Sequence, residues 1–177
     1  DLYSLFNFME MLDRPIIALV NGYCVAGGLE LLLACDFAYA AEGAKIGDGH
    51  VNFGMIGGGG SNVRLPLSIL PQQAREILFT GKMITANEAL SLGLVNRVVP
   101  NDKLIEAGLE FANIIATKSA LGIHIIKQVC NRSLEMRKED GLHLEIQMAH
   151  HYALTSHDAR EGLIAFSEKR QPKFLGR

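Results

Sequence analysis

The sequence lacks an excess of charge of either sign. Its 177 residues include 17 lysines and arginines against 19 aspartates and glutamates, which gives a formal net charge of −2. A protein that binds nucleic acid regardless of sequence usually carries a clear basic excess, because contacts to the phosphate backbone dominate that affinity. We therefore expect no nucleic-acid partner. Hydrophobic residues make up 49% of the chain, which is typical of a folded globular protein.

Long apolar runs are also absent. No segment approaches the roughly 18–20 apolar residues that a helix needs to span a bilayer. The apolar stretch 29–34 contains Glu30 and is soon followed by Asp36. We therefore expect no membrane partner. The chain begins with Asp1 rather than Met and shows no secretory signal, so we expect a cytoplasmic protein, or a mitochondrial matrix protein if a transit peptide has been removed.

Cysteine is scarce. The three cysteines, Cys24, Cys35 and Cys130, are an odd number, and no C-x-x-C spacing joins them. Each lies in an apolar stretch, so we interpret them as small buried hydrophobic residues in a reducing compartment rather than as a disulfide set.

Strand-like and helical patterns alternate through the first part of the chain. Residues 16–20 are a β-branched apolar run that is typical of a strand buried on both faces. Thr85 and Glu88 have the spacing of a capping box at the start of a helix. The patterns predict strands over 16–20, 37–41 and 94–99, and helices over 2–11, from 28 to about 35, from about 61, over 71–79 and after 85.

The rest of the chain is predicted to be helical. Apolar residues at 123, 126, 130 and 134 form one stripe, with Lys127 on a face that we expect to be solvated. Further helices are expected over about 142–154 and 158–169, the last starting with a D-x-x-E pattern at Asp158 and Glu161. The fold class is therefore α/β with a C-terminal helical subdomain, and we predict domains at 1–117 and 118–177.

The first candidate site lies at residues 21–30, where the predicted strand ends, two glycines follow and a helix begins. The first N–H groups of a helix have no intrahelical partner, and glycine lets a ligand oxygen approach them closely. Gly27 and Gly28 could therefore stabilise an oxygen that becomes negative during a reaction, with Glu30 facing the same pocket. Alternatively, the glycines only allow close packing, and Glu30 is a solvated carboxylate favoured by the helix dipole.

The second candidate site is the glycine-rich segment 46–61. It is not a Walker A loop, because no Gly-Lys-Ser/Thr follows, and it lacks the G-x-G-x-x-G spacing and later acidic residue of a dinucleotide site. Four glycines before a helix indicate close backbone approach to a ligand, or only a tight crossover.

Several motifs together resemble the crotonase (enoyl-CoA hydratase/isomerase) superfamily. These are N-G-Y-x-x-x-G-G-x-E-L from Asn21, G-M-I-G-G-G-G-S-x-x-R-L from Gly54, T-G-x-x-I-T-A-x-E-A-L-x-L-G-L-V-N-x-V-V-P from Thr80, and E-G-L-x-A-F-x-E-K-R-x-P-x-F-x-G from Glu161. The resemblance is collinear from about Asp13 to Gly176. It implies a crotonase-like spiral of β-β-α turns with a helical trimerisation region, assembled as a homotrimer or a dimer of trimers.

The resemblance also implies a chemistry. Such enzymes bind an acyl-CoA thioester and hold its carbonyl oxygen between two backbone N–H groups, which stabilises an enolate. The Gly27 N–H matches one of these oxyanion donors, Glu30 matches a catalytic glutamate, and the Gly58 N–H matches a group that helps to hold the reacting water. No cofactor is expected, since coenzyme A is part of the substrate, and no metal is expected either.

Contacts to the acyl-CoA are implied at four further positions. Ala26 and Gly28 flank the oxyanion donor and are expected to contact the substrate. Phe166 and Lys169 match C-terminal residues that contact CoA, often across a subunit boundary.

Two departures from the family pattern stand out. His50 occupies the position, twenty residues after Glu30, where the hydratases carry a second glutamate. The strands and the second oxyanion donor that the family places before the first motif have no counterpart here, so we expect the N-terminal part of the family fold to be missing from this chain. Removal of one oxyanion donor typically costs about 10²–10³ in rate.

The most direct expectation is hydration of a 2-enoyl-CoA to a 3-hydroxyacyl-CoA, with Glu30 as base and His50 as second acid/base group, oriented by Asp48. Alternatives are an isomerase that uses Glu30 alone, and a C–C or thioester hydrolase in which His50 activates water. His50 could also line the pocket without transferring a proton, and the chain could be a non-catalytic CoA-binding or scaffold subunit.

Overall fold

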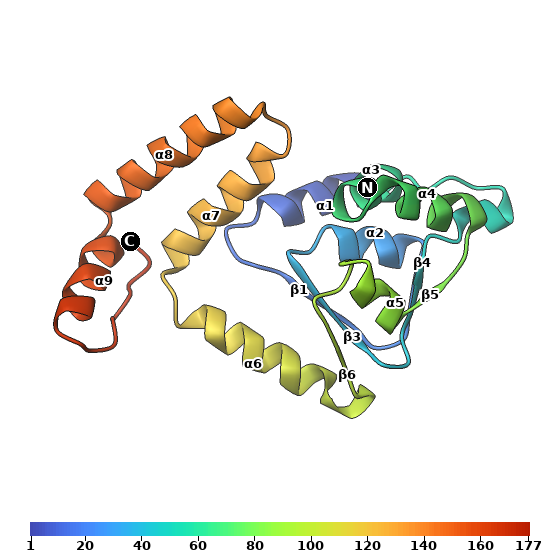
Figure 1. The fold of residues 1–177 in the computed structure, drawn as a ribbon, viewed down its shortest axis with the longest axis horizontal. Helices are drawn as coiled ribbons and strands as arrows, with labels where there is room; N and C mark the ends of the chain where they lie inside the picture. The colour runs from blue at the N-terminus through green and yellow to red at the C-terminus, as the bar shows by residue number, and fades with distance from the viewer. The chain divides into compact units, whose positions relative to one another are not determined.

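In the computed structural model, which describes residues 1–177, strands and helices alternate before the chain becomes wholly helical (Figure 1). In chain order the elements are α1 (Leu2–Met11), β1 (Ile17–Val20), β2 (Tyr23–Val25), α2 (Gly27–Leu33), β3 (Phe37–Ala41), β4 (Lys45–Gly47), the 3-10 helix η1 (His50–Phe53), α3 (Ser61–Ser68), α4 (Pro71–Thr80), β5 (Ile84–Thr85), α5 (Ala86–Ser91), β6 (Arg97–Val99), the 3-10 helix η2 (Asn101–Lys103), α6 (Leu104–Ala116), α7 (Ala120–Ser133), α8 (Lys138–Thr155) and α9 (His157–Ser167).

The chain forms two compact units. The first unit consists of Asp1–Glu10 and Ile16–Phe111, and the second consists of Met11–Pro15 and Ala112–Arg177.

None of the helices is by itself long and apolar enough to cross a bilayer. One helix pair, Asn101–Ala116 with Ala120–Ser133, meets the length and composition requirement jointly, but it is bent by 104°.

Two three-stranded sheets organise the first unit. One has the order β1-β3-β6 and is parallel throughout, while the other has the order β2-β4-β5, with β4 and β5 antiparallel. Strands β1 to β4 therefore alternate between the sheets, with α2 returning the chain from β2 to β3, while β5 stays in the second sheet beside β4 and β6 returns to the first. This is the β-β-α spiral that the resemblance implied, so the predicted fold class is confirmed.

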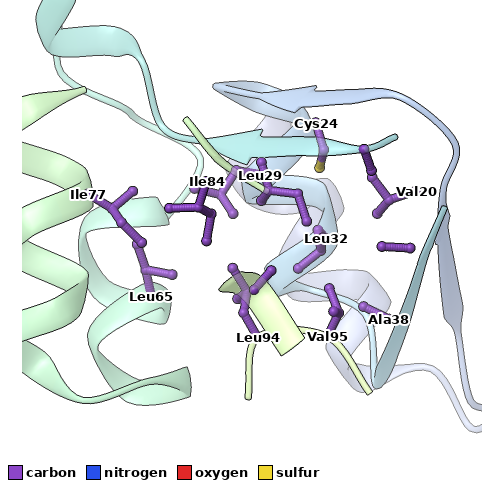
Figure 2. Close-up of a cluster of buried hydrophobic side chains, with 14 of the residues drawn as sticks. Val20, Cys24, Leu29, Leu32, Ala38, Leu65, Ile77, Ile84, Leu94 and Val95 are labelled. Atoms are coloured by element: carbon purple, nitrogen blue, oxygen red, sulfur yellow. The ribbon is translucent and has the colours of Figure 1, made fainter. Parts of the chain in front are cut away.

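Helix α2 is buried at the centre of the first unit (Figure 2). Its Leu29 and Leu32 are only 0% and 5% exposed. Burial of a leucine side chain contributes about 1.5–3 kcal/mol, so α2 is held firmly in place. Because Glu30 follows Leu29 directly, the same packing fixes the backbone from which its carboxylate extends. Other members of this cluster are Val20, Cys24, Ala38, Ile46, Leu65, Ile77, Ile84, Leu94 and Val95.

In the second unit, a buried carboxylate links three separate segments through hydrogen bonds. Asp158, 1% exposed, accepts hydrogen bonds from the Ser119 hydroxyl at 2.6 Å and from the backbone N–H groups of Leu175 and Gly176 at 2.7 and 2.9 Å. It therefore ties the start of α9 both to the N-cap of α7 and to the C-terminal segment. The two long helices α7 and α8 of this unit lie side by side (Figure 1).

Several sequence predictions need correction. The strands β2, β4 and β5 were not predicted, because segments of two or three residues are too short to show a period of two. The N-cap of α9 is Ser156, whose hydroxyl accepts from the N–H of Asp158, whereas the D-x-x-E pattern suggested a start at Asp158 itself. Lys127 is buried rather than solvated, and its ammonium donates to the carbonyl of Arg14 at 3.2 Å.

The cysteine prediction holds in part. Cys24 is buried, and this burial raises the pKa of its thiol to about 11. Cys35 is only half-buried and Cys130 is exposed, so the prediction of burial was wrong for Cys130. No disulfide joins any two of them.

Candidate active site

Glu30 is a buried carboxylate with a defined hydrogen-bond donor. It lies in the first turn of α2 and is only 2% exposed. Its Oε1 accepts the backbone N–H of Gly59 at 2.7 Å, so a residue of the glycine-rich loop holds this oxygen. Burial of a carboxylate is costly unless its oxygens are hydrogen-bonded, and the loop offsets part of this cost.

The turn before α2 is strained. Ala26 has φ 54° and ψ −117°, a conformation that residues other than glycine rarely adopt. Its N–H donates to the carbonyl of Gly47 at 3.2 Å, which continues the pairing of β2 with β4 for one residue. Strained backbone of this kind is concentrated at functional sites, where the surrounding structure imposes it.

His50 and Asp48 form a hydrogen-bonded pair just after β4. The ring Nδ1 of His50 lies 3.0 Å from Oδ2 of Asp48, and the backbone N–H of His50 donates to the same oxygen at 3.3 Å. Gly49 between them has φ 70°, which turns the chain back so that both contacts can form. The side chains of His50 and Asp48 are 15% and 4% exposed. The contact that the sequence suggested between them is therefore present.

Glu30 and His50 converge on Gly57. A Cβ atom built at Gly57 would lie 2.9 Å from Glu30 Oε1, 3.1 Å from His50 Cε1 and 2.5 Å from Ser61 Oγ. No side chain fits there, so glycine at this position lets a carboxylate, an imidazole and a hydroxyl approach one another. Ser61 is fully buried, and its Oγ has no hydrogen-bond partner. The two residues proposed for acid/base chemistry are thus brought together from different turns of the spiral.

Arg64 anchors the glycine-rich loop. This role was not predicted, because the motif S-x-x-R-L marks the position of the arginine but not its contacts. Its guanidinium donates to the carbonyl of Gly59 at 2.8 Å, to Asn7 at 2.7 Å and to Glu10 at 2.6 Å. The hydrogen bond to Glu10 is the main reason why the pKa of Arg64 is raised. Gly59 therefore donates to Glu30 and accepts from Arg64.

The glycines predicted to supply backbone N–H groups have open surroundings. A Cβ at Gly27 or Gly58 would meet no atom within 4 Å, and one at Gly28 would meet only the sulfur of Cys24 at 3.7 Å. Gly27 is the first residue of α2, where N–H groups have no intrahelical acceptor. The space beside these three glycines is therefore open, whereas the N–H of Gly59 is already bound to Glu30.

The predicted CoA contacts lie in the second unit. Phe166, on α9, is 86% exposed, and Lys169 just after the helix has φ 53°. Arg170 follows, and its guanidinium is bound by Glu161 at 2.6 Å and by Glu168 at 2.6 Å. The Arg170 hydrogen bond is the main cause that lowers the pKa of Glu161 to about 2, so this ion pair fixes the turn that presents Lys169.

No group of three or more His, Cys, Asp or Glu side chains is arranged to hold a metal ion. His124, on α7, has its Nε2 3.0 Å from the amide nitrogen of Gln128, while its Nδ1 is buried without a partner.

Comparisons with known proteins identify the family of this fold and site. The sequence model described as enoyl-CoA hydratase/isomerase matches residues 1–177. The chain therefore belongs to the enoyl-CoA hydratase/isomerase family, as its motifs predicted. Among solved structures, an enoyl-CoA hydratase from Bacillus anthracis superposes with a TM-score of 0.96 at 36% identity, over 99% of this chain and 68% of that one.

Curated relatives carry related names. The chain is 34% identical to a crotonyl-CoA hydratase of Syntrophomonas wolfei over 174 residues, 38% identical to a probable mitochondrial enoyl-CoA hydratase of Dictyostelium discoideum over 172 residues, and 39% identical to a carnitinyl-CoA dehydratase of Salmonella typhimurium over 169 residues. These matches cover 98%, 97% and 94% of this chain. The chain spans 66%, 62% and 65% of the lengths of these three relatives, slightly under two thirds.

Proposed function

We propose that this protein hydrates a 2-enoyl-CoA to a 3-hydroxyacyl-CoA. The observation that carries the proposal is the convergence of the buried Glu30 carboxylate and the His50 ring on Gly57. A positioned acid or base contributes about 10²–10⁴ to a rate, and a hydration needs one group of each kind. The names of the hydratases and the dehydratase among the relatives support the same reaction class.

In the proposed mechanism, Glu30 removes a proton from water while the water oxygen bonds to Cβ of the enoyl thioester. The electron pair of the double bond moves toward the thioester carbonyl oxygen, which becomes negative and is stabilised by the N–H of Gly27. The protonated His50 then transfers its Nε2 proton to Cα. Transfer of a proton from Glu30 back to His50 restores the starting state. The N–H of Gly58 is proposed to help hold the water.

Four residues are proposed to bind the acyl-CoA. We propose that Ala26 and Gly28 contact the thioester, and that Phe166 and Lys169 contact the CoA moiety. The exposure of Phe166 and the fixed turn at Lys169 support this role. No cofactor, metal, nucleic acid or membrane takes part in the proposed reaction.

We further propose assembly as a homotrimer or a dimer of trimers, in the cytoplasm or the mitochondrial matrix. The large apolar side chains that α7 and α8 expose, among them Ile126, Leu142 and Ile146, are consistent with an interface. Sedimentation velocity of the full-length protein tests the assembly, because a monomer at micromolar concentration would contradict it.

The hydratase proposal is tested with the full-length protein, crotonyl-CoA and a longer 2-enoyl-CoA. We expect Glu30→Gln and His50→Gln each to lower kcat by about 10²–10⁴ while binding of butyryl-CoA, which cannot be hydrated, is retained. The exposed residues Glu42 and His151 provide matched controls as Glu42→Gln and His151→Gln, which should keep the rate of the unaltered protein.

Three other outcomes would contradict the proposed reaction or the proposed roles of Glu30 and His50. If no enoyl-CoA is hydrated although butyryl-CoA binds, the hydratase assignment is wrong, and isomerase and hydrolase substrates are the next to assay. If Glu30→Gln hydrates at the unaltered rate, Glu30 is not the base. Loss of activity in Glu30→Gln alone, with His50→Gln unaffected, would leave His50 as a residue that only lines the pocket.

A further inference from the structure

One oxygen of the Asp48 carboxylate carries all of its hydrogen bonds. Oδ2 contacts both the ring Nδ1 and the backbone N–H of His50, at 3.0 and 3.3 Å. Oδ1 is buried and has no hydrogen-bond partner. The residue as a whole is only 3% exposed, so water does not replace the missing partner at the surface.

This arrangement is unfavourable for stability. A buried carboxylate oxygen without a partner loses its hydration and gains nothing in return. No lysine or arginine pairs with Asp48, and its only ionisable partner is His50. An uncharged side chain of the same shape would lower the desolvation cost. The negative charge is therefore best explained by its effect on the imidazole ring.

We propose that Asp48 is a positioning residue for His50, an inference that rests on the hydration proposed above. By accepting the proton of Nδ1, Asp48 holds the ring in one orientation and one tautomer, with Nε2 as the nitrogen available for proton exchange. The Cε1 atom between the two nitrogens lies 3.1 Å from a Cβ built at Gly57, and Glu30 Oε1 lies 2.9 Å from the same point, so the free edge of the ring and the carboxylate border the same space. The carboxylate also stabilises the imidazolium from which the proton leaves.

The backbone makes this pair rigid. Asp48 directly follows β4, whose last residue Gly47 pairs with Val25 of β2. The positive φ of Gly49 then brings the His50 N–H onto the same oxygen that the ring contacts. Because two donors of one residue share a single acceptor, the ring cannot rotate away without breaking the hydrogen bond to Nδ1.

Two variants of the full-length protein separate the effect of the hydrogen-bond acceptor at position 48 from the effect of its negative charge. Asp48→Ala removes the acceptor, and we expect kcat for crotonyl-CoA to fall by about 10²–10⁴ while KM stays within about twofold. Asp48→Asn keeps an oxygen acceptor without the charge, so its kcat should lie between those of Asp48→Ala and the unaltered protein. Its melting temperature should be unchanged or higher, because a buried charge has been removed.

The matched control is Asp36→Asn. Asp36 also accepts a backbone N–H, that of Ile16 at 2.7 Å, but it lies at the other end of α2 from Glu30. We expect its kcat to remain within about twofold of the unaltered value. The inference would be overturned if both Asp48→Ala and Asp48→Asn kept full kcat. It would also be overturned if both variants lost stability and showed a raised KM in parallel with the loss of kcat, because that result describes a purely structural role.

Long-range ¹H–¹⁵N spectra of protein labelled at histidine test the same inference without turnover. His50, assigned by its absence from His50→Gln, should carry its neutral-form proton on Nδ1, and in Asp48→Ala this proton should redistribute toward Nε2. An unchanged tautomer would overturn the inference even if hydration is observed. A shifted tautomer in a protein that hydrates no enoyl-CoA would instead support the positioning role and refute the proposed reaction.

Discussion

The backbone N–H of Gly59 donates a hydrogen bond of 2.7 Å to Oε1 of Glu30. A side chain on Gly59 would prevent this contact, because a Cβ there would lie 2.5 Å from Glu30 Oε2 and 2.8 Å from Phe6 Cε2. The carboxylate is therefore fixed from two sides, by the packing of α2 and by the glycine-rich loop. Such fixed groups need little reorganisation when a reaction begins.

Gly57→Ala should impair the reaction more than the fold. The added methyl would collide with Ser61 Oγ and displace Glu30 and His50, which meet at this position. A displacement of about 1 Å can cost about 10²-fold in rate, so we expect a fall of that order in kcat/KM for crotonyl-CoA. Gly22→Ala is the control, because a Cβ at Gly22 meets nothing within 4 Å. Equal activity of the two variants would contradict the geometry described for Gly57.

Arg64→Met should destabilise the first unit. The substitution leaves the Gly59 carbonyl and the Glu10 carboxylate without their guanidinium donor. Lost hydrogen bonds to a partly buried charged group cost about 1–3 kcal/mol, which urea denaturation would measure as a lower free energy of unfolding. The exposed Arg75, as Arg75→Met, should cost far less. A similar loss in both variants would show that Arg64 does not anchor the loop.

Ala26→Gly should raise the free energy of unfolding. Relief of the positive φ at Ala26 gains about 1–2 kcal/mol, and the greater freedom of glycine in the unfolded chain returns about 0.4–1 kcal/mol of this. We therefore expect a net gain of about 1 kcal/mol by thermal or urea denaturation. The buried Ala44 lies at an ordinary φ, so Ala44→Gly should be destabilising. Changes of the same sign in both variants would argue against strain at Ala26.

Asp158 should make the protein sensitive to acid. Burial acts to raise the pKa of this carboxyl, but the hydrogen bonds from Ser119, Leu175 and Gly176 outweigh it, and the pKa falls from 3.8 to about 2. A pKa that is lower in the folded state stabilises the fold above about pH 4, and this stabilisation is lost as the pH falls toward 2. Its size is about 2 kcal/mol.

Asp158→Asn tests this contribution through urea denaturation at a series of pH values. We expect the variant to be less stable than the unaltered protein at pH 6 and the difference to shrink between pH 4 and pH 2. Asp140, an exposed residue of α8, serves as control through Asp140→Asn, which should follow the pH dependence of the unaltered protein. A gap that stays constant with pH would mean that ionisation of Asp158 does not stabilise the fold.

The sequence predicts those elements whose signals are local. The Thr85–Glu88 capping box is present, with the Glu88 N–H donating to Thr85 at 3.2 Å and the Thr85 N–H to Glu88 at 2.6 Å. The long helices and the strand 37–41 follow from periodicity in the same way. The short strands β2, β4 and β5 depend on pairing between distant segments, which no window of a few residues contains.

The candidate site shows a similar division. The position of Glu30 after a glycine turn is visible in the sequence, as is the unusual histidine at position 50. The role of Gly59 as the donor to Glu30 and that of Arg64 as the anchor of Gly59 are not visible, because they join residues 29 and 5 positions apart through side-chain directions. The burial of Asp48 with one unpartnered oxygen likewise depends on the tertiary packing around it.

The parallel pairing of β2 with β4 has a consequence for how this scaffold can change. Val25 and Gly47 are register partners at the carboxyl ends of these two strands, and Glu30 and His50 follow them on separate, successive turns of the chain. A substitution at position 50 therefore alters one of the two proposed acid/base groups without moving the backbone that holds the other. Because the two groups can be exchanged independently, a single codon change at position 50 could give the same fold a different pH optimum or a different reaction.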